Sequence, residues 1–160
     1  MIREVHPDDA ETLARIYNIY VNRSTATFDT EPLSVADMRE KIEHISAHYP
    51  FFVYEEQSEV VGFCYAHTWK EKAAYQTTAE TTVYLAPEAT GSGIGRFLLL
   101  RLIEACRIQG LHSLIACVTQ GNAASDKLHV NLGFKKVSHF SKVGRKFDQW
   151  LDVVDYELEL

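Results

Sequence analysis

The chain has 160 residues, of which 46% are hydrophobic and 24% charged, and its formal net charge is −6. This length and composition are typical of one globular domain, and we expect residues 1–160 to form it. The sixteen Lys and Arg residues form no basic block, so nucleic acid is not an expected partner. No apolar run reaches the roughly 18 residues of a membrane span, and no signal segment is visible. We therefore expect a cytoplasmic protein without a membrane partner.

The three cysteines, Cys64, Cys106 and Cys117, lie in apolar stretches and form no C-x-x-C pair. This odd number and spacing predict reduced, buried thiols, not a disulfide framework. The cysteines give no catalytic signal.

The first half of the chain predicts a strand, two helices and a hairpin. Alternation indicates a strand over 2–6, and Asp8 or Asp9 is expected to cap the helix that follows. A second helix starts at Ser34, because Asp37 three positions later resembles a capping box. Apolar, β-branched and aromatic runs then predict an antiparallel hairpin with strands over 51–56 and 60–69.

The second half predicts strand, glycine loop, helix and strand. Residues 79–86 form the first strand, helical spacing follows the glycines as far as Gly110, and 113–120 is a continuous apolar strand. This order indicates a βαβ crossover with parallel pairing. A short helix over 122–133 and strands over 134–140 and 150–160 complete the chain. The sequence therefore predicts an α/β fold with a mixed sheet.

The stretch "PEATGSGIGR", residues 87–96, carries glycines at alternate positions between a strand and a helix. Glycine permits positive φ and close approach of a ligand, and the first N–H groups of a helix have no intrahelical partner, so an anion site is possible here. A Walker loop is excluded because no Lys-Ser or Lys-Thr follows, and the dinucleotide fingerprint G-x-G-x-x-G is not matched. The glycines alone do not distinguish an anion cradle from a flexible turn.

Two motifs in order resemble those of the GNAT acetyltransferase superfamily. Gly93 and Gly95 match the glycines of its pyrophosphate motif [Q/R]-x-x-G-x-[G/A], with Thr90 in place of the Gln or Arg. Residues 122–134 are similar to its second motif, in the form N-x-x-S-x-x-L-H-x-x-x-G-F. The departure at Thr90 puts a side-chain contact there in doubt but leaves the backbone cradle intact.

Further stretches resemble the phosphinothricin and methionine sulfone N-acetyltransferase family over nearly the whole length. They are "IYNIYV", "TATFDTEPLS", "AYQTTAETTVYL" and "GRKFDQWLD". The resemblance implies a single-domain GNAT-like fold with a mixed, mostly antiparallel sheet of about seven strands, a central parallel pair and about four helices. It also implies acetyl-CoA as co-substrate and a homodimer.

The resemblance assigns a set of residues to acetyl-CoA. The pyrophosphate would lie on the N–H groups of the glycine stretch, at the positive end of the following helix. A splayed strand would pair with the pantetheine. The expected cofactor-binding residues are Val83, Tyr84, Leu85, Gly91, Ser92, Gly93, Ile94, Gly95, Arg96, Asn122 and Ser125.

Acetyl transfer to an amine needs a base for the ammonium and a proton for the departing thiolate. Family matching makes Glu80 the candidate base, acting through water, and the alternative is a solvated strand-edge carboxylate. His129 stands where many superfamily members have a tyrosine acid, so it would act as general acid, order the water that does, or be structural. A backbone N–H in 83–85 would polarise the thioester carbonyl.

The predicted substrate-binding residues are Phe28, Lys70, Lys72, Glu80, Thr81 and Thr82. Lys70 and Lys72 replace arginines that hold the substrate's acidic group in the family, which keeps the charge but loses the bidentate fork. His44 and His48 have helical i, i+4 spacing but no third ligand, so no metal is expected.

The leading hypothesis is an N-acetyltransferase that uses direct transfer in a ternary complex. Its substrate would be the α-amino group of a small amino-acid analogue of the phosphinothricin or methionine sulfone and sulfoximine type. The alternatives are acetylation of another small amine or of a protein amine, and a non-catalytic acyl-CoA-binding sensor module.

Overall fold

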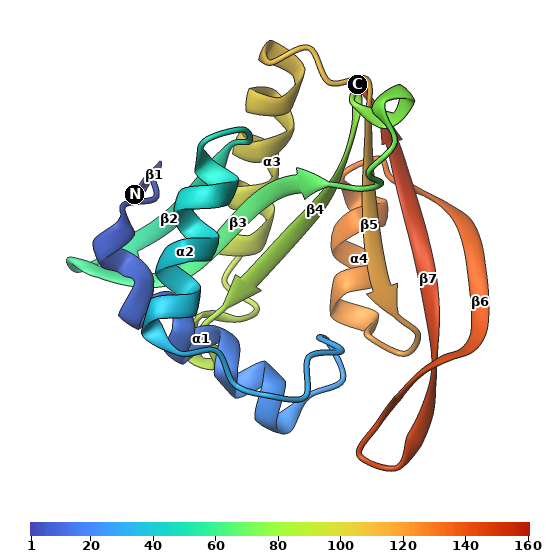
Figure 1. Cartoon of the computed structure of the whole chain (residues 1–160), viewed down its shortest axis with the longest axis horizontal. Helices are drawn as coiled ribbons and strands as arrows, with labels where there is room; N and C mark the ends of the chain where they lie inside the picture. The colour runs from blue at the N-terminus through green and yellow to red at the C-terminus, as the bar shows by residue number, and fades with distance from the viewer.

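A computed structural model describes all 160 residues and shows one seven-stranded sheet, in the order β1-β2-β3-β4-β5-β7-β6. Four α-helices accompany it (Figure 1). The strands are β1 (Ile2–Glu4), β2 (Phe51–Glu56), β3 (Glu59–Thr68), β4 (Thr78–Leu85), β5 (Ser113–Thr119), β6 (Lys135–Lys146) and β7 (Gln149–Glu159). The helices are α1 (Ala10–Arg23), α2 (Val35–Ser46), α3 (Ile94–Ile108) and α4 (Ala123–Asn131).

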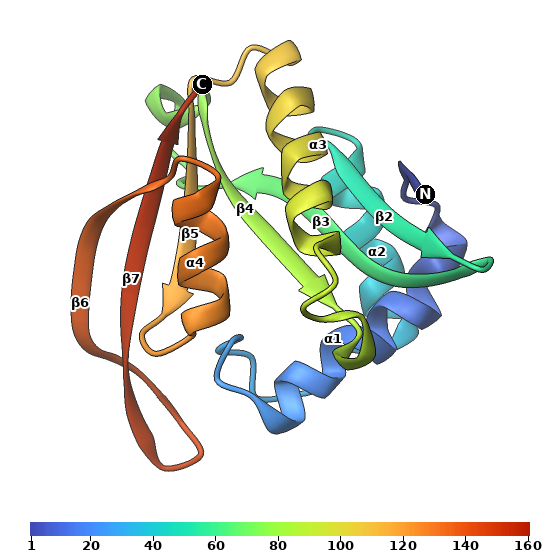
Figure 2. The same cartoon turned by 180° about the vertical axis from the view of Figure 1, so that it is seen from behind.

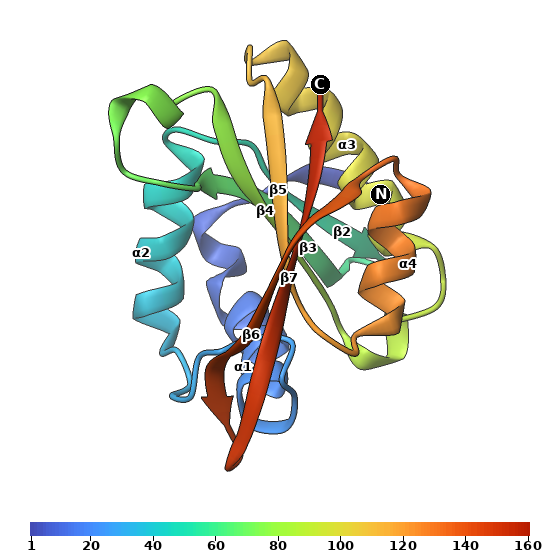
Figure 3. The same cartoon turned by 90° about the vertical axis from the view of Figure 1, so that its right-hand side faces the viewer.

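The helices cover both faces of the sheet. Helices α1 and α2 lie on one face, while α3 and α4 lie on the other, as the views from behind and from the side show (Figures 2 and 3). A cluster of 32 buried residues fills the layers, with Leu13, Met38, Phe63 and Leu98 among the fully buried side chains. Burial of such apolar surface is the main favourable contribution to folding.

The sheet splits in its middle. Strands β4 and β5 are parallel, but only 78–80 pair with 113–115. Beyond Glu80 the two strands diverge, which Figure 1 shows as an opening between their arrowheads. On their outer edges β4 stays paired with β3 down to Leu85, and β5 with β7 over its whole length. The split therefore leaves facing strand edges without strand partners.

The predicted fold is confirmed, including the parallel pair and the crossover through α3. Ser34 and Asp37 form the expected capping box of α2. Asp9 is the N-cap residue of α1, as predicted, but its side chain makes no capping hydrogen bond to that helix. Its carboxylate instead accepts from the His6 N–H and pairs with Arg3, because a short 3-10 turn precedes the helix.

Strand β6 extends further than predicted, to Lys146, and bulges interrupt its pairing with β7. Bulges break the strict alternation on which strand prediction depends. None of the helices combines the length and apolar character needed to cross a bilayer.

Candidate active site

The split between β4 and β5 opens into a cleft of about 830 Å³. Fourteen of the residues predicted from the sequence line it, together with neighbours such as Tyr20, Cys117 and Lys127. They are Phe28, Glu80, Thr81, Thr82, Val83, Tyr84, Leu85, Gly91, Gly93, Gly95, Arg96, Asn122, Ser125 and His129. Ser92, Ile94, Lys70 and Lys72 are not part of this lining. The fold thus brings most of the predicted site into one cavity.

The glycine stretch leads directly into the N-terminus of α3. Gly91 and Gly93 have φ values of 74° and 88°, a region that favours glycine, and Gly93 caps the helix without a side chain. The hydroxyls of Thr90 and Ser92 donate to the carbonyls of Pro87 and Ala89 in the preceding turn. These side chains stabilise the loop itself, so backbone N–H groups and Arg96 remain to meet an anion.

The second half of β4 lies beside the cleft with one backbone edge unpaired. Val83 pairs with Cys64 of β3 on one side, while the parallel ladder to β5 has already ended at Glu80. The hydroxyl of Tyr20 donates to the Leu85 carbonyl at 2.6 Å and fixes the end of the strand. An extended ligand with amide groups could therefore add to this edge as a strand would.

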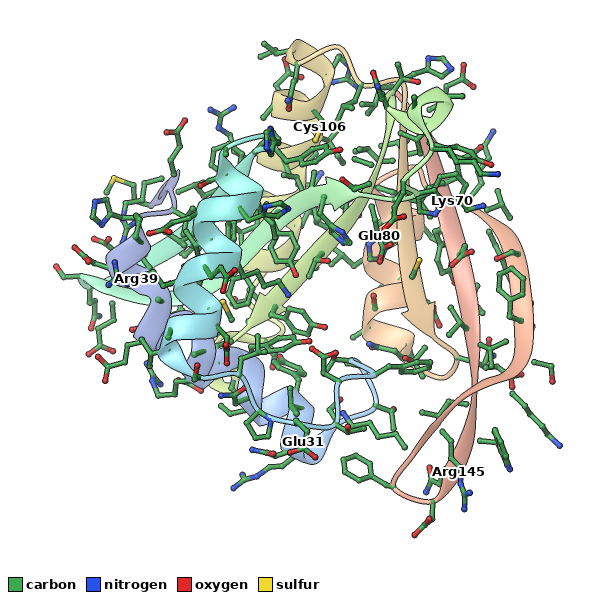
Figure 4. All side chains as sticks on the ribbon, viewed as in Figure 1. Glu31, Arg39, Lys70, Glu80, Cys106 and Arg145 are labelled. Carbon is green, nitrogen blue, oxygen red and sulfur yellow. The ribbon has the colours of Figure 1, made fainter.

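Glu80 lies where β4 and β5 begin to separate (Figure 4). Burial raises the pKa of its carboxyl, a hydrogen bond from Cys117 opposes the rise, and the charge of Asp155 adds to it. The Nε2 atom of His67, on the neighbouring strand β3, lies 3.8 Å from its Oε1. A partly desolvated carboxylate with a raised pKa has the properties of a general base.

Cys117 is a site residue that the sequence analysis missed. Cys117 was expected to be buried, but the residue is exposed along the cleft, and its thiol hydrogen-bonds Glu80. Partial desolvation and the carboxylates of Glu80 and Asp155 raise the pKa of this thiol, so it remains protonated and donates. Glu80 pairs with Ile115 in the parallel register, and Cys117, two residues later on β5, faces the same side as Ile115. Knowledge of that register would have placed Cys117 beside Glu80.

His129 of α4 is held with one ring nitrogen toward the helix backbone and the other toward the cleft. Its Nδ1 lies 2.8 Å from the Ser125 carbonyl, which can only accept, so Nδ1 carries the proton. Burial lowers the pKa of the ring, and the neutral form therefore has a lone pair on Nε2. The Nε2 atom of His129 makes no hydrogen bond within the protein. Every fully buried side-chain nitrogen in the structure has a hydrogen-bond partner, so Nε2 is not fully buried and faces the cleft.

The loop after α1 is tied to β6 by Lys146. This side chain is only 4% exposed, and its ammonium donates to the carbonyls of Ser24, Thr27 and, at 3.4 Å, Tyr20. The loop presents Phe28 to the cleft, and the Phe28 ring lies against the bare backbone of Gly144, where a Cβ would overlap it. Lys146 therefore fixes the loop that carries a predicted substrate-binding residue.

We expect Lys146→Met to lower the free energy of unfolding by about 2–4 kcal/mol, because buried carbonyls lose a charged donor. The KM of the acceptor should rise while the KM of acetyl-CoA stays unchanged, since the loop carries Phe28 and the glycine stretch lies on a different segment of the lining. Urea unfolding and steady-state kinetics measure the two effects. The exposed Lys135→Met on the same strand is the control, and equal effects of both variants would contradict this role.

Lys70 and Lys72 lie outside the cleft in this conformation. The Lys70 ammonium lies 4.2 Å from the ring centroid of Trp69 and 5.2 Å from that of Tyr75, in the loop before β4. Such cation–π contacts hold a lysine without neutralising its charge. Their role in substrate binding stays a prediction.

Comparison with known proteins agrees with this geometry. The acetyltransferase (GNAT) domain family matches residues 2–154. A phosphinothricin N-acetyltransferase of Streptomyces coelicolor is 37% identical over 96% of this chain and 92% of its own length. An L-methionine sulfoximine/L-methionine sulfone acetyltransferase of Pseudomonas paraeruginosa is 34% identical over 99% of this chain and 94% of its own length.

A solved structure extends the comparison to the fold. The phosphinothricin acetyltransferase of Sinorhizobium meliloti, in complex with acetyl-CoA, superposes with a TM-score of 0.97 at 31% identity. The match covers all of this chain and 88% of that one. The resemblance found in the sequence is thus confirmed by the domain match, by the named relatives and by the superposed fold. The chain belongs to the GNAT acetyltransferase family.

Proposed function

We propose that the protein transfers the acetyl group of acetyl-CoA to the α-amino group of a small amino-acid analogue such as phosphinothricin or methionine sulfoximine. The observation that carries this proposal is the placement of Glu80 at the closed end of the β4–β5 split, in one cleft with the glycine stretch. The named relatives support the substrate class.

Acetyl-CoA fits the residues on the α3 side of the cleft. Its pyrophosphate would accept from the N–H groups at the start of α3, beside Arg96, and its pantetheine would follow the free edge of β4. A cradle with positive φ at Gly91 and Gly93 leaves room for phosphate oxygens that Cβ atoms would take. The thioester would then reach the residues near Glu80 and Cys117.

Transfer proceeds directly within the complex of enzyme, acetyl-CoA and acceptor. Glu80 takes a proton from the acceptor ammonium, directly or through water, and the neutral amine attacks the thioester carbonyl. The C–N bond forms, the C–S bond breaks, and a second nitrogen-bound proton goes to the thiolate. A backbone N–H of 83–85 polarises the carbonyl oxygen during this step.

His129 serves this step by ordering water, which is one of the two catalytic roles expected from its position. The neutral ring has its only proton on Nδ1, bonded to Ser125, and it therefore has none on Nε2 to give to a thiolate. The Nε2 lone pair can instead accept from a water molecule that gives one proton to the sulfur and takes the second nitrogen-bound proton in its place.

A panel of amines tests the substrate class. Release of free thiol from acetyl-CoA is measured with phosphinothricin, methionine sulfone, methionine sulfoximine, common amino acids and an N-terminal peptide. We expect the largest kcat/KM for the amino-acid analogues. Preference for the peptide or for an amine without a carboxylate would overturn the substrate class, and binding of acetyl-CoA without any thiol release would favour the sensor module.

We propose further that the protein is a cytoplasmic homodimer. The hairpin of β6 and β7 projects from the body (Figure 3) and exposes apolar side chains, among them Val137, Phe140, Val143, Phe147 and Trp150. Exposed apolar groups of this kind mark surfaces that pair with a partner. Light scattering after size exclusion should give twice the chain mass of 18.2 kDa, and a mass of one chain would contradict the dimer.

A further inference from the structure

A second cleft lies on the other side of Glu80. It has a volume of about 710 Å³ and shares no lining residue with the first. Its walls come from α2, the end of β3 and the connection between α3 and β5. The lining includes Lys41, His44, His48, Tyr49, His67 and Gln109. His67 lines this second cleft and also lies next to Glu80, which lines the first.

The antiparallel register fixes this contact. His67 of β3 lies directly opposite Glu80 of β4, and their Nε2 and Oε1 atoms are 3.8 Å apart. The two side chains keep 32% and 27% of their surface exposed, so water reaches the pair. From this separation a small rotation of either side chain brings the carboxyl and the ring within hydrogen-bond distance.

The ring of His67 is held in its neutral form, which has one ring nitrogen free to take a proton. Burial and the nearby ammonium of Lys41 lower the pKa of the ring, while a backbone hydrogen bond with Thr68 opposes the shift. The other polar groups around it are His44 and His48 of α2 and Tyr49 on the cleft wall, Tyr65 on its own strand and Glu80. Glu80 is the carboxylate among these groups, so the neutral ring can take its proton and pass it to water.

The reaction needs such an outlet. Conversion of an ammonium and a thioester into an amide and a thiol releases one net proton per turnover, because the ammonium loses two protons and the thiolate keeps one. The released proton is first on Glu80. With acetyl-CoA and acceptor in the first cleft, the water around that face of the carboxyl is displaced.

We propose that His67 is a positioning residue that holds Glu80 toward the acceptor and carries its proton into the water of the second cleft. The O–H bond of protonated Glu80 breaks, an N–H bond forms on His67, and water then takes the proton from the ring. This inference rests on the proposed function, because it needs Glu80 as the base. It gives the second cleft a function, which is to receive the proton that Glu80 takes from the acceptor.

The test is His67→Ala with chemical rescue. We expect kcat to fall roughly tenfold, less than for loss of a direct base, with the KM of acetyl-CoA unchanged. Added imidazole, which fits the space left by the ring, should restore kcat, and the rate should depend on buffer concentration at constant pH and ionic strength. His67→Gln fills that space with a group that does not titrate, so imidazole should not rescue it.

His48→Gln is the matched control, because His48 lines the same cleft without contact to Glu80. It should keep wild-type kcat and buffer independence. A wild-type kcat in His67→Ala would contradict proton transfer through His67. So would a loss of kcat that imidazole does not restore, in a variant whose unfolding is like that of wild type. If the His67 variants contradict the proton path but Glu80→Gln is inactive in the same assays, the proposed function still holds. Wild-type rates in Glu80→Gln would contradict both the role of Glu80 as base and the proton path through His67.

Discussion

Replacing Glu80 with glutamine is expected to lower kcat/KM for the acceptor roughly a hundredfold at neutral pH, the lower end of the effect of a general base. Glutamine keeps the size of the side chain but cannot take a proton from the acceptor ammonium. The affinity for acetyl-CoA should remain unchanged, because the glycine stretch is untouched. Steady-state kinetics across pH and calorimetric titration with acetyl-CoA measure both quantities.

The expected loss of kcat/KM depends on pH. Burial raises the pKa of Glu80 above the usual 4.5, so wild-type kcat/KM should fall as the pH drops through the raised value. The variant lacks this group, and its rate should follow only the deprotonation of the acceptor amine. The fold loss in the variant is therefore small at high pH, where the amine is neutral by itself, and it grows as the pH falls, to its largest value at and below the raised pKa of Glu80.

The same substitution should stabilise the protein at neutral pH. A carboxyl whose pKa is raised in the folded state lowers stability as the pH rises through the interval between 4.5 and the raised value. Glu80→Gln should therefore have a higher Tm than wild type at neutral pH and an equal one at pH values below this interval. Glu59→Gln, at the exposed start of β3, is the control and should change neither Tm nor kcat/KM.

If the kinetics of Glu80→Gln equal those of wild type, Glu80 is not the base of the reaction.

The sequence predicted the parts of the site that depend on local patterns. The strand predicted over 79–86 contained Glu80, and glycine spacing before a helical stretch placed the cradle at the start of α3. It did not predict the contact of Cys117 with Glu80, because that contact depends on the register between two parallel strands. Patterns within one strand determine which residues share a face but not how far one strand slides along its neighbour.

Contacts between distant segments were also beyond prediction. Lys146 binds the carbonyl of Thr27, 119 positions earlier, and a lysine near the end of a polar strand normally predicts a solvated charge. The pairing of His67 with Glu80 similarly required the register of β3 on β4. In each case a single side chain joins segments whose local patterns are independent of one another.

Replacing Gly93 with valine is expected to weaken acetyl-CoA binding by at least about a hundredfold, equal to the loss of two charged hydrogen bonds of about 1.5 kcal/mol each. Gly93 has a φ of 88°, which a β-branched residue avoids, so the loop would turn its N–H groups away from the pyrophosphate. A Cβ there meets only the Phe97 ring, at 3.8 Å. The folded protein can therefore hold the valine, in space that faces the cleft.

Gly110→Val separates this binding effect from the cost of strain. Gly110 has the same φ of 88° and no atom within 4 Å of an added Cβ, but it lies past the far end of α3. Both variants should lose a similar 1–3 kcal/mol or so of stability from the strained backbone. Calorimetric titration should show wild-type acetyl-CoA affinity in Gly110→Val and a large loss in Gly93→Val. Equal affinities in the two variants would mean that the glycine stretch is a flexible turn and that the pyrophosphate binds elsewhere.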